Sequence, residues 1–111
     1  MAAGDVTIDG NSGRSLGRNL ILICGTVTLD GANPTPVNLD GLCDSVLMAT
    51  VSFERTTAPG ADPVLVTCSP SGATLNVYAW KATTAGAGGN ADLVASTNNA
   101  VEVAFVALCR R

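Results

Sequence analysis

After residue 17, apolar and polar residues alternate with the two-residue period of β-strands over most of the chain. Six segments combine this alternation with β-branched or aromatic residues, and sequences rich in Gly, Pro, Asn or Asp separate them. These segments are Arg18–Asp30, Leu42–Arg55, Val64–Ser69, Ala73–Thr84, Asp92–Ser96 and Ala100–Cys109. A further segment, Asn33–Val37, contains two prolines, which lack the N–H that a central strand needs, so we expect it to be short and to lie at a sheet edge.

Turn sequences fall at short and regular intervals between these segments. They are Asp30-Gly31, Asp40-Gly41, Ala58–Pro63, Ala85–Asn90 and Ser96–Asn99. A helix competes with strands only within Ala91–Cys109, where the polar interruption and the valine content argue against it. We therefore predict an all-β fold, a single-domain antiparallel β-sandwich of jelly-roll or immunoglobulin-like type with about six to eight strands.

The first 17 residues have a different character from the rest of the chain. They contain four glycines and few apolar side chains that a core could use. We expect a flexible N-terminal arm over residues 1–17, which adds at most a short strand at Asp5–Ile8, and a sandwich domain over residues 18–111.

Each long predicted strand has one apolar face, which we assign to the core. The residues of these faces are Val27 and Leu29; Leu47, Ala49, Val51 and Phe53; Leu75, Val77 and Ala79; and Val101, Val103 and Phe105.

Three of the strands are apolar on their second face as well. In a two-layer sandwich the outer face of each sheet normally meets water, so these side chains need a cover. Two covers are compatible with the sequence: the chain's own loops or arm, or another subunit through a contact that resembles a core cut in half. The candidate interface residues are Leu20, Leu22, Cys24, Val46, Met48, Val106 and Leu108.

Tyr78 and Trp80 form another candidate site, because they share the polar face of their strand and lie next to Lys81. Three interpretations are open. The two rings cover the outer face of their own sheet, anchor a protein partner, or provide a stacking platform for a sugar.

Composition narrows the classes of partner. Hydrophobic residues make up 47% of the chain and charged residues 14%, against about 25% charged in typical domains, which favours an apolar surface covered by a partner. The net charge is −3, and the few basic residues are scattered, so we expect no nucleic-acid partner. The sequence shows neither a signal-peptide pattern nor an apolar run long enough for a membrane span, so we expect no membrane association.

Candidate chemistry is sparse. The chain has no histidine, which removes the commonest general base and metal ligand. Glu54 and Glu102 lie on predicted solvent faces, and the aspartates mainly occupy turns, so a carboxylate pair for hydrolysis is not indicated. Neither a calcium loop pattern nor a phosphate loop is present. We predict that the protein is not an enzyme and uses no metal and no cofactor.

The four cysteines, Cys24, Cys43, Cys68 and Cys109, are widely spaced and form no close pair of the kind that binds zinc. An even number permits two disulfides in an oxidising compartment. Without a secretion signal, we expect four reduced thiols that pack as small apolar side chains.

The sequences of Gly25–Leu39, Ala58–Pro63 and Thr74–Thr84, followed by Asp92–Ser96 and a valine-rich last strand, extend over nearly the whole chain. In these phrases the chain resembles small virion proteins of tailed phages, particularly head decoration (cement) proteins. The resemblance implies a β-sandwich subunit, often trimeric, on the outer capsid surface, where it bridges neighbouring major capsid subunits around local three-fold positions. It supplies no set of functional residues.

Together these observations predict a structural virion protein, assembled in the host cytoplasm, with two partners: copies of itself in a homotrimer, and the major capsid protein. In this hypothesis the doubly apolar strands form the trimer, and residues 1–17 engage the capsid. The alternatives are another virion component, in the tail, neck or head fibre, and a carbohydrate-binding β-sandwich module.

Overall fold

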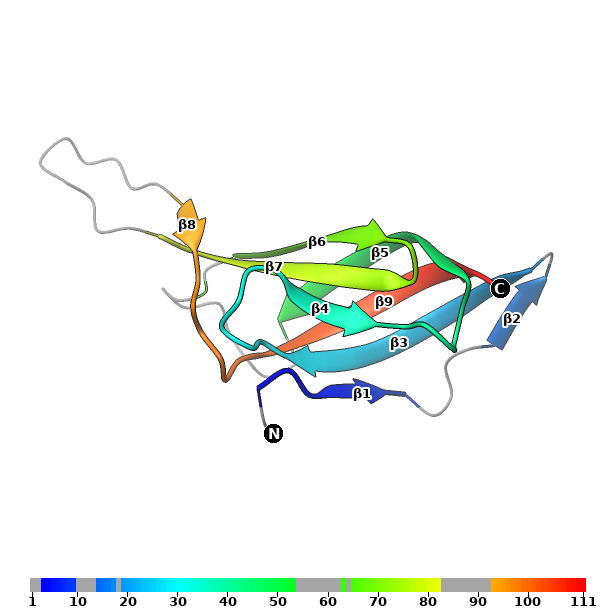
Figure 1. Ribbon diagram of the computed structural model, residues 1–111, viewed down its shortest axis with the longest axis horizontal. Coiled ribbons are helices and arrows are strands. Elements are labelled where there is room, and N and C mark those ends of the chain that lie inside the picture. Colours follow the sequence, from blue (N-terminus) through cyan, green and yellow to red (C-terminus); the bar gives the residue numbers. More distant parts are fainter. Residues whose placement is uncertain (1–2, 10–13, 18, 54–62, 64, 83–92) are drawn as a thin grey trace, which may run out of the picture.

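The structure, a computed structural model, describes residues 3–9, 14–17, 19–53, 63, 65–82 and 93–111. In these residues the chain is all-β, with two antiparallel sheets packed face to face, as Figure 1 shows. The first sheet contains β1 (Val6–Ile8), β2 (Arg14–Gly17), β3 (Leu20–Thr28), β5 (Ser45–Phe53) and β9 (Glu102–Arg110). The second contains β4 (Thr35–Asn38), β6 (Leu65–Ser71), β7 (Thr74–Ala82) and β8 (Leu93–Ala95). The predicted sandwich is confirmed, and no helix in the described ranges is long and apolar enough to cross a membrane.

The last strand lies at the centre of the first sheet. β9 pairs with β3 along one edge and with β5 along the other, and all three strands are nine residues long. Paired residues in an antiparallel ladder point to the same face, and successive residues point to opposite faces. Val103, Phe105, Ala107 and Cys109 therefore point into the sandwich, where each is at most 1% exposed.

In the second sheet β7 is the central strand. β6 pairs with one edge of it, from Leu65↔Trp80 to Ser71↔Thr74, and β4 and β8 follow each other along the opposite edge. Ala79 lies between these two short strands, and its backbone forms hydrogen bonds with residues outside them. Its N–H donates to the side-chain oxygen of Asn33 (2.8 Å), and its carbonyl accepts from Ser96 N (2.9 Å). The proline-containing segment thus lies at a sheet edge, as predicted.

The core lies between the two sheets and takes its side chains from both. Leu75, Val77 and Ala79 of β7 are buried, as the alternation predicted, and so are Val27 of β3 and Leu29, which follows this strand. On one side of the sandwich the sheets meet where β5 packs against β6, and there the Cys68 thiol donates to the carbonyl of Ala49 (3.5 Å).

The aspartate–glycine turns form as expected. Asp30 Oδ1 accepts hydrogen bonds from Ala32 N (2.8 Å) and from the hydroxyl of Thr35 (2.9 Å), and Gly31 has a φ of 85°. At the second turn Gly41 has a φ of 91°. The carboxylate of Asp30 thus shapes its turn, the role that this residue type favours. The predicted loop over residues 85–90 lies outside the described residues, as does most of the turn over residues 58–63.

The N-terminal segment is more closely tied to the sandwich than an arm over residues 1–17 would be. The short strand predicted at Asp5–Ile8 forms as β1, which pairs with the second half of β3, while β2 pairs with its first half. Both therefore extend the first sheet at its β3 edge. Counting these two, the described residues contain nine strands, more than predicted.

A β-bulge in β5 overturns the predicted facing of two residues. Val46 pairs with Cys109, but Met48, two residues on, pairs with Leu108, so Leu47 is an extra residue. Val46 was predicted on the outer face and Leu47 in the core, and both predictions are wrong: Val46 is 7% exposed and Leu47 is 42% exposed. An inserted residue shifts the alternation of side chains by one, which exchanges the two faces.

Two buried threonines give a matched test of hydrogen bonding in the core. Thr28 is 1% exposed, and its hydroxyl has no hydrogen-bond partner; Thr35 is fully buried and bonds to Asp30. We expect Thr28→Val to raise the free energy of unfolding by about 1 kcal/mol, because the substitution removes an unsatisfied polar group at constant shape. Thr35→Val should lower it by about 1–3 kcal/mol, because it removes the hydrogen bonds that the Thr35 hydroxyl donates to Asp30 Oδ1 and accepts from Asp30 N. Urea unfolding of both variants measures the difference, and equal effects would contradict this assignment.

Candidate functional site

The outer face of the first sheet carries an apolar surface across three strands. Leu22, Leu108 and Met48 lie side by side on β3, β9 and β5. In the next row Cys24 and Val106 lie beside Thr50. We call Leu22, Cys24, Met48, Val106 and Leu108 the outer apolar patch.

The residues that the structure describes leave this patch uncovered. Met48 is 62% exposed and Val106 is 43% exposed, while Leu22, Cys24 and Leu108 are half-buried by their neighbours in the sheet. β1 and β2 lie beside β3 in the plane of the sheet, so these two strands extend the face and do not cross it. Of the predicted covers, the described part of the arm is therefore not the one that shields the patch.

The structure brings most of the predicted interface residues together on this face and places one of them in the core. Leu22, Cys24, Met48, Val106 and Leu108 are brought together on one surface. Leu20 continues the same face, half-buried, in the row of Arg110 and Ser45. Val46 belongs to the core instead, because of the bulge.

Two open hollows mark the patch, and Val106 lines both. The smaller, of about 190 Å³, is lined by Leu22, Met48, Ala49, Thr50, Val106 and Leu108. Its lining is almost entirely apolar and carries no charged side chain. An apolar side chain of a partner fits such a hollow. Its binding would bury no charged group of this protein.

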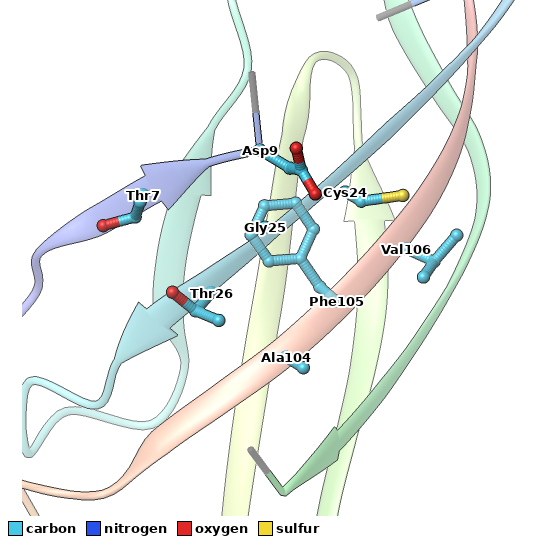
Figure 2. Close-up of a pocket in the computed structure, with 8 residues that line it drawn as sticks. All are labelled: Thr7, Asp9, Cys24, Gly25, Thr26, Ala104, Phe105 and Val106. Atoms are coloured by element: carbon cyan, nitrogen blue, oxygen red, sulfur yellow. The ribbon is translucent and has the colours of Figure 1, made fainter. Parts of the chain in front are cut away.

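The larger hollow, of about 360 Å³, lies where β1 meets β3, and Figure 2 shows its lining. Besides patch residues Cys24 and Val106, it is lined by Thr7, Asp9, Gly25, Thr26, Ala104 and Phe105. Gly25 pairs with Phe105 across the ladder, and the ring of Phe105 lies against it. A Cβ on residue 25 would overlap the carbonyl oxygen of Thr7 and come within 3.0 Å of Cζ of Phe105. The close approach of β1 to β3 therefore requires glycine at this position.

Tyr78 and Trp80 lie on the outer face of the second sheet. Their rings stack on each other, with centroids 6.2 Å apart and planes 14° apart. The indole N–H of Trp80 donates to the hydroxyl of Thr67 on the neighbouring strand (2.9 Å). Both rings are half-buried. Of the three interpretations, this geometry favours rings that cover their own sheet, since each already packs on the other and the indole N–H already has a partner.

The four cysteines are free thiols in two kinds of environment. Cys24 and Cys68 are half-buried on different sheets, and burial raises the pKa of the Cys68 thiol. Cys43 and Cys109 are both buried. Burial, followed by hydrogen bonding to Cys43 and the charge of Cys43, raises the pKa of Cys109 to about 12, so its thiol is neutral at physiological pH.

Groups that could carry other chemistry stay apart. Among the described residues, no three His, Cys, Asp or Glu side chains are close enough to hold a metal ion. Glu102 is half-buried at the start of β9, and Glu54 lies outside the described residues. Asp9 lines the larger hollow.

Comparison of the chain with protein-family models, with curated proteins and with solved structures finds no match in any of the three.

Three features of the site were not predicted from the alternation of apolar and polar residues. Gly25 is one, although a lone glycine inside an apolar strand signals a close backbone approach. Leu47 is another, because the alternation alone does not reveal the bulge. The third is the contact between Cys43 and Cys109, which are 66 positions apart in the sequence.

Gly25→Ala tests the close packing at the larger hollow. We expect the substitution to lower the free energy of unfolding by about 1–3 kcal/mol, because the methyl group must displace the backbone of β1 at Thr7 or the ring of Phe105. In a chain that lacks residues 1–9 the overlap with Thr7 is absent, so the same substitution should cost less. Urea unfolding of the four proteins gives both values. If Gly25→Ala lowers the free energy of unfolding equally with and without residues 1–9, β1 does not pack closely against Gly25.

Proposed function

We propose that the protein is a structural subunit of a tailed-phage virion, a capsid decoration protein that assembles with copies of itself and binds the major capsid protein. The observation that carries the proposal is the outer apolar patch, an uncharged surface on a sheet face that a solitary sandwich would expose to water. We propose a phage capsid as the particular assembly because the sequence resembles those of decoration proteins.

The patch has the properties of a subunit contact. It is built on three paired strands, so its shape is fixed before a partner binds and little conformational entropy is lost on association. Its most exposed members, Met48 and Val106, are apolar, and the smaller hollow lies between them and Leu22. A partner that fills this hollow removes apolar surface from water, at about 25 cal/mol per Å².

A decoration protein stabilises a shell through many repeated contacts. Each contact can be modest, because linked sites on a symmetric particle add through avidity. Binding to the assembled shell, and not to its separate parts, stabilises the shell by mass action. A small rigid sandwich with one apolar sheet face meets these requirements without catalytic machinery.

The hydrogen bonding of β1 and β2 modifies the role that we assign to the N-terminal segment. Deleting residues 1–17 would remove both strands and expose the N–H and C=O groups of the β3 edge, so the deletion would perturb the fold as well as any capsid contact. Point substitutions on the patch are a cleaner probe.

Self-association is tested by substituting one residue on each sheet. The two residues are matched because their exposed fractions are equal. Val106 lies in the patch and Leu65 on the outer face of the second sheet, and each is 43% exposed. We expect the unmodified protein to be oligomeric by light scattering and Val106→Asp to be monomeric, because a carboxylate buried in the contact loses its hydration without a partner. Leu65→Asp should keep the oligomer.

Thermal unfolding serves as the check on both variants. The self-association proposal is wrong if the unmodified protein is monomeric at all accessible concentrations, or if Leu65→Asp dissociates the oligomer as completely as Val106→Asp does. A dissociated Val106→Asp that still unfolds cooperatively supports an interface at the patch.

The position on the particle is tested by cryo-electron microscopy of virions that carry the chain. We expect density for the sandwich on the outer head surface, at sites that contact several major capsid subunits. Particles assembled with Val106→Asp should show lower occupancy of these sites and should release their genome at a lower temperature. Density for the chain in the tail, neck or a head fibre would instead assign it to that component.

A further inference from the structure

Cys43 and Cys109 stand apart from the other two cysteines because the fold brings them into contact inside the core. Both belong to the main cluster of buried side chains, Cys43 with 9% and Cys109 with 0% of its surface exposed. The Cys43 side chain is close enough to raise the pKa of the Cys109 thiol. Nothing in the proposed function depends on this pair.

The backbone around both residues is fixed by hydrogen bonds. Cys43 N donates to the carbonyl of Leu39 (3.2 Å), which closes the turn between β4 and β5. The next residue, Asp44, donates from its backbone N to the carbonyl of Arg110 (2.8 Å), and this bond holds the turn against the end of β9. Three residues after Cys43, Val46 pairs directly with Cys109. The contact of the thiols is thus a consequence of sheet register and turn geometry.

We infer that Cys43 and Cys109 form a disulfide when the folded protein meets a small disulfide oxidant such as oxidised glutathione. Two thiols held in contact by the surrounding backbone need only a local adjustment to reach the geometry of a disulfide. The link joins the β4–β5 turn to the end of the last strand and encloses β5 to β9 in one covalent loop.

The reaction proceeds by thiol–disulfide exchange and is balanced. Cys43, the more exposed of the two, loses its proton; its sulfur attacks one sulfur of the oxidant, and the S–S bond of the oxidant breaks to release one glutathione. The sulfur of Cys109 then loses its proton and displaces the second glutathione, which forms the protein disulfide. The protein gives up two protons and two electrons, and these appear in two molecules of reduced glutathione.

The other cysteines cannot replace this pair in the folded chain. Cys24 points to the outer face of the first sheet, in the row of Val106. Cys68 lies on β6 of the second sheet and donates to the carbonyl of Ala49. A sheet separates the two side chains, so a link between them would require the sandwich to unfold.

The test uses the full chain with Cys24→Ser and Cys68→Ser, which leaves Cys43 and Cys109 as its two thiols. The protein is equilibrated with mixtures of reduced and oxidised glutathione, starting from the reduced and from the oxidised form, in native buffer and in urea. Because the Cys109 thiol is buried and neutral, exchange in native buffer is slow, and agreement of the two starting points establishes equilibrium. Acid quenching, alkylation and intact mass then give the fraction with two hydrogen atoms lost.

We expect the equilibrium constant for disulfide formation to be higher in the folded protein than in urea by about 30-fold or more. The oxidised form should then melt at a higher temperature than the reduced form, since the disulfide restricts the unfolded chain. Adding Cys43→Ala should abolish both effects.

Equal equilibrium constants in native buffer and in urea would overturn the inference, and so would a product that stops at the mixed disulfide with glutathione. If the doubly substituted chain does not fold, peptide mapping of the unmodified protein oxidised in native buffer decides the same point. A Cys43–Cys109 peptide supports the inference, and a Cys24-linked dimer or a Cys24–Cys68 peptide as the main product contradicts it.

Discussion

β9 lies between β3 and β5, and this placement determines which side chains reach each face of the first sheet. Its residues from Val103 to Arg110 are paired on both sides, so their alternate side chains must go to opposite faces of the sheet. Phe105 and Ala107 fill the core, while Val106 and Leu108 are carried to the outer face. Because β9 is apolar at successive positions, it contributes apolar side chains both to the core and to the outer face of the first sheet.

Two local irregularities determine the details of that exterior. The bulge at Leu47 turns Val46 into the core and leaves Met48 beside Leu108 on the outer face. Gly25 lets β1 approach β3 closely and leaves room for the ring of Phe105. Without these two features the first sheet would present a different set of side chains, and the hollows at the patch would not have their present linings.

The distribution of chemistry fits a protein that acts through its surface. Polar groups in the described turns, such as Asp30 and Asn33, are used by the backbone. Tyr78 and Trp80 are engaged with each other and with Thr67. What is left for interaction is the outer apolar patch of the first sheet, and this surface is the basis of the proposed association.

Alternation and turn residues are local signals, and from them the sequence predicted the all-β class, the turns at Asp30-Gly31 and Asp40-Gly41, and the buried faces of β7 and β9. It also indicated most of the apolar patch, since Leu22, Met48 and Val106 stand at doubly apolar positions. The tertiary structure alone decided which strands are neighbours, where the bulge falls and that Cys43 meets Cys109. These outcomes depend on pairing between residues far apart in the chain, and the register of such pairing is set by packing over the whole sandwich, which no short stretch of sequence contains.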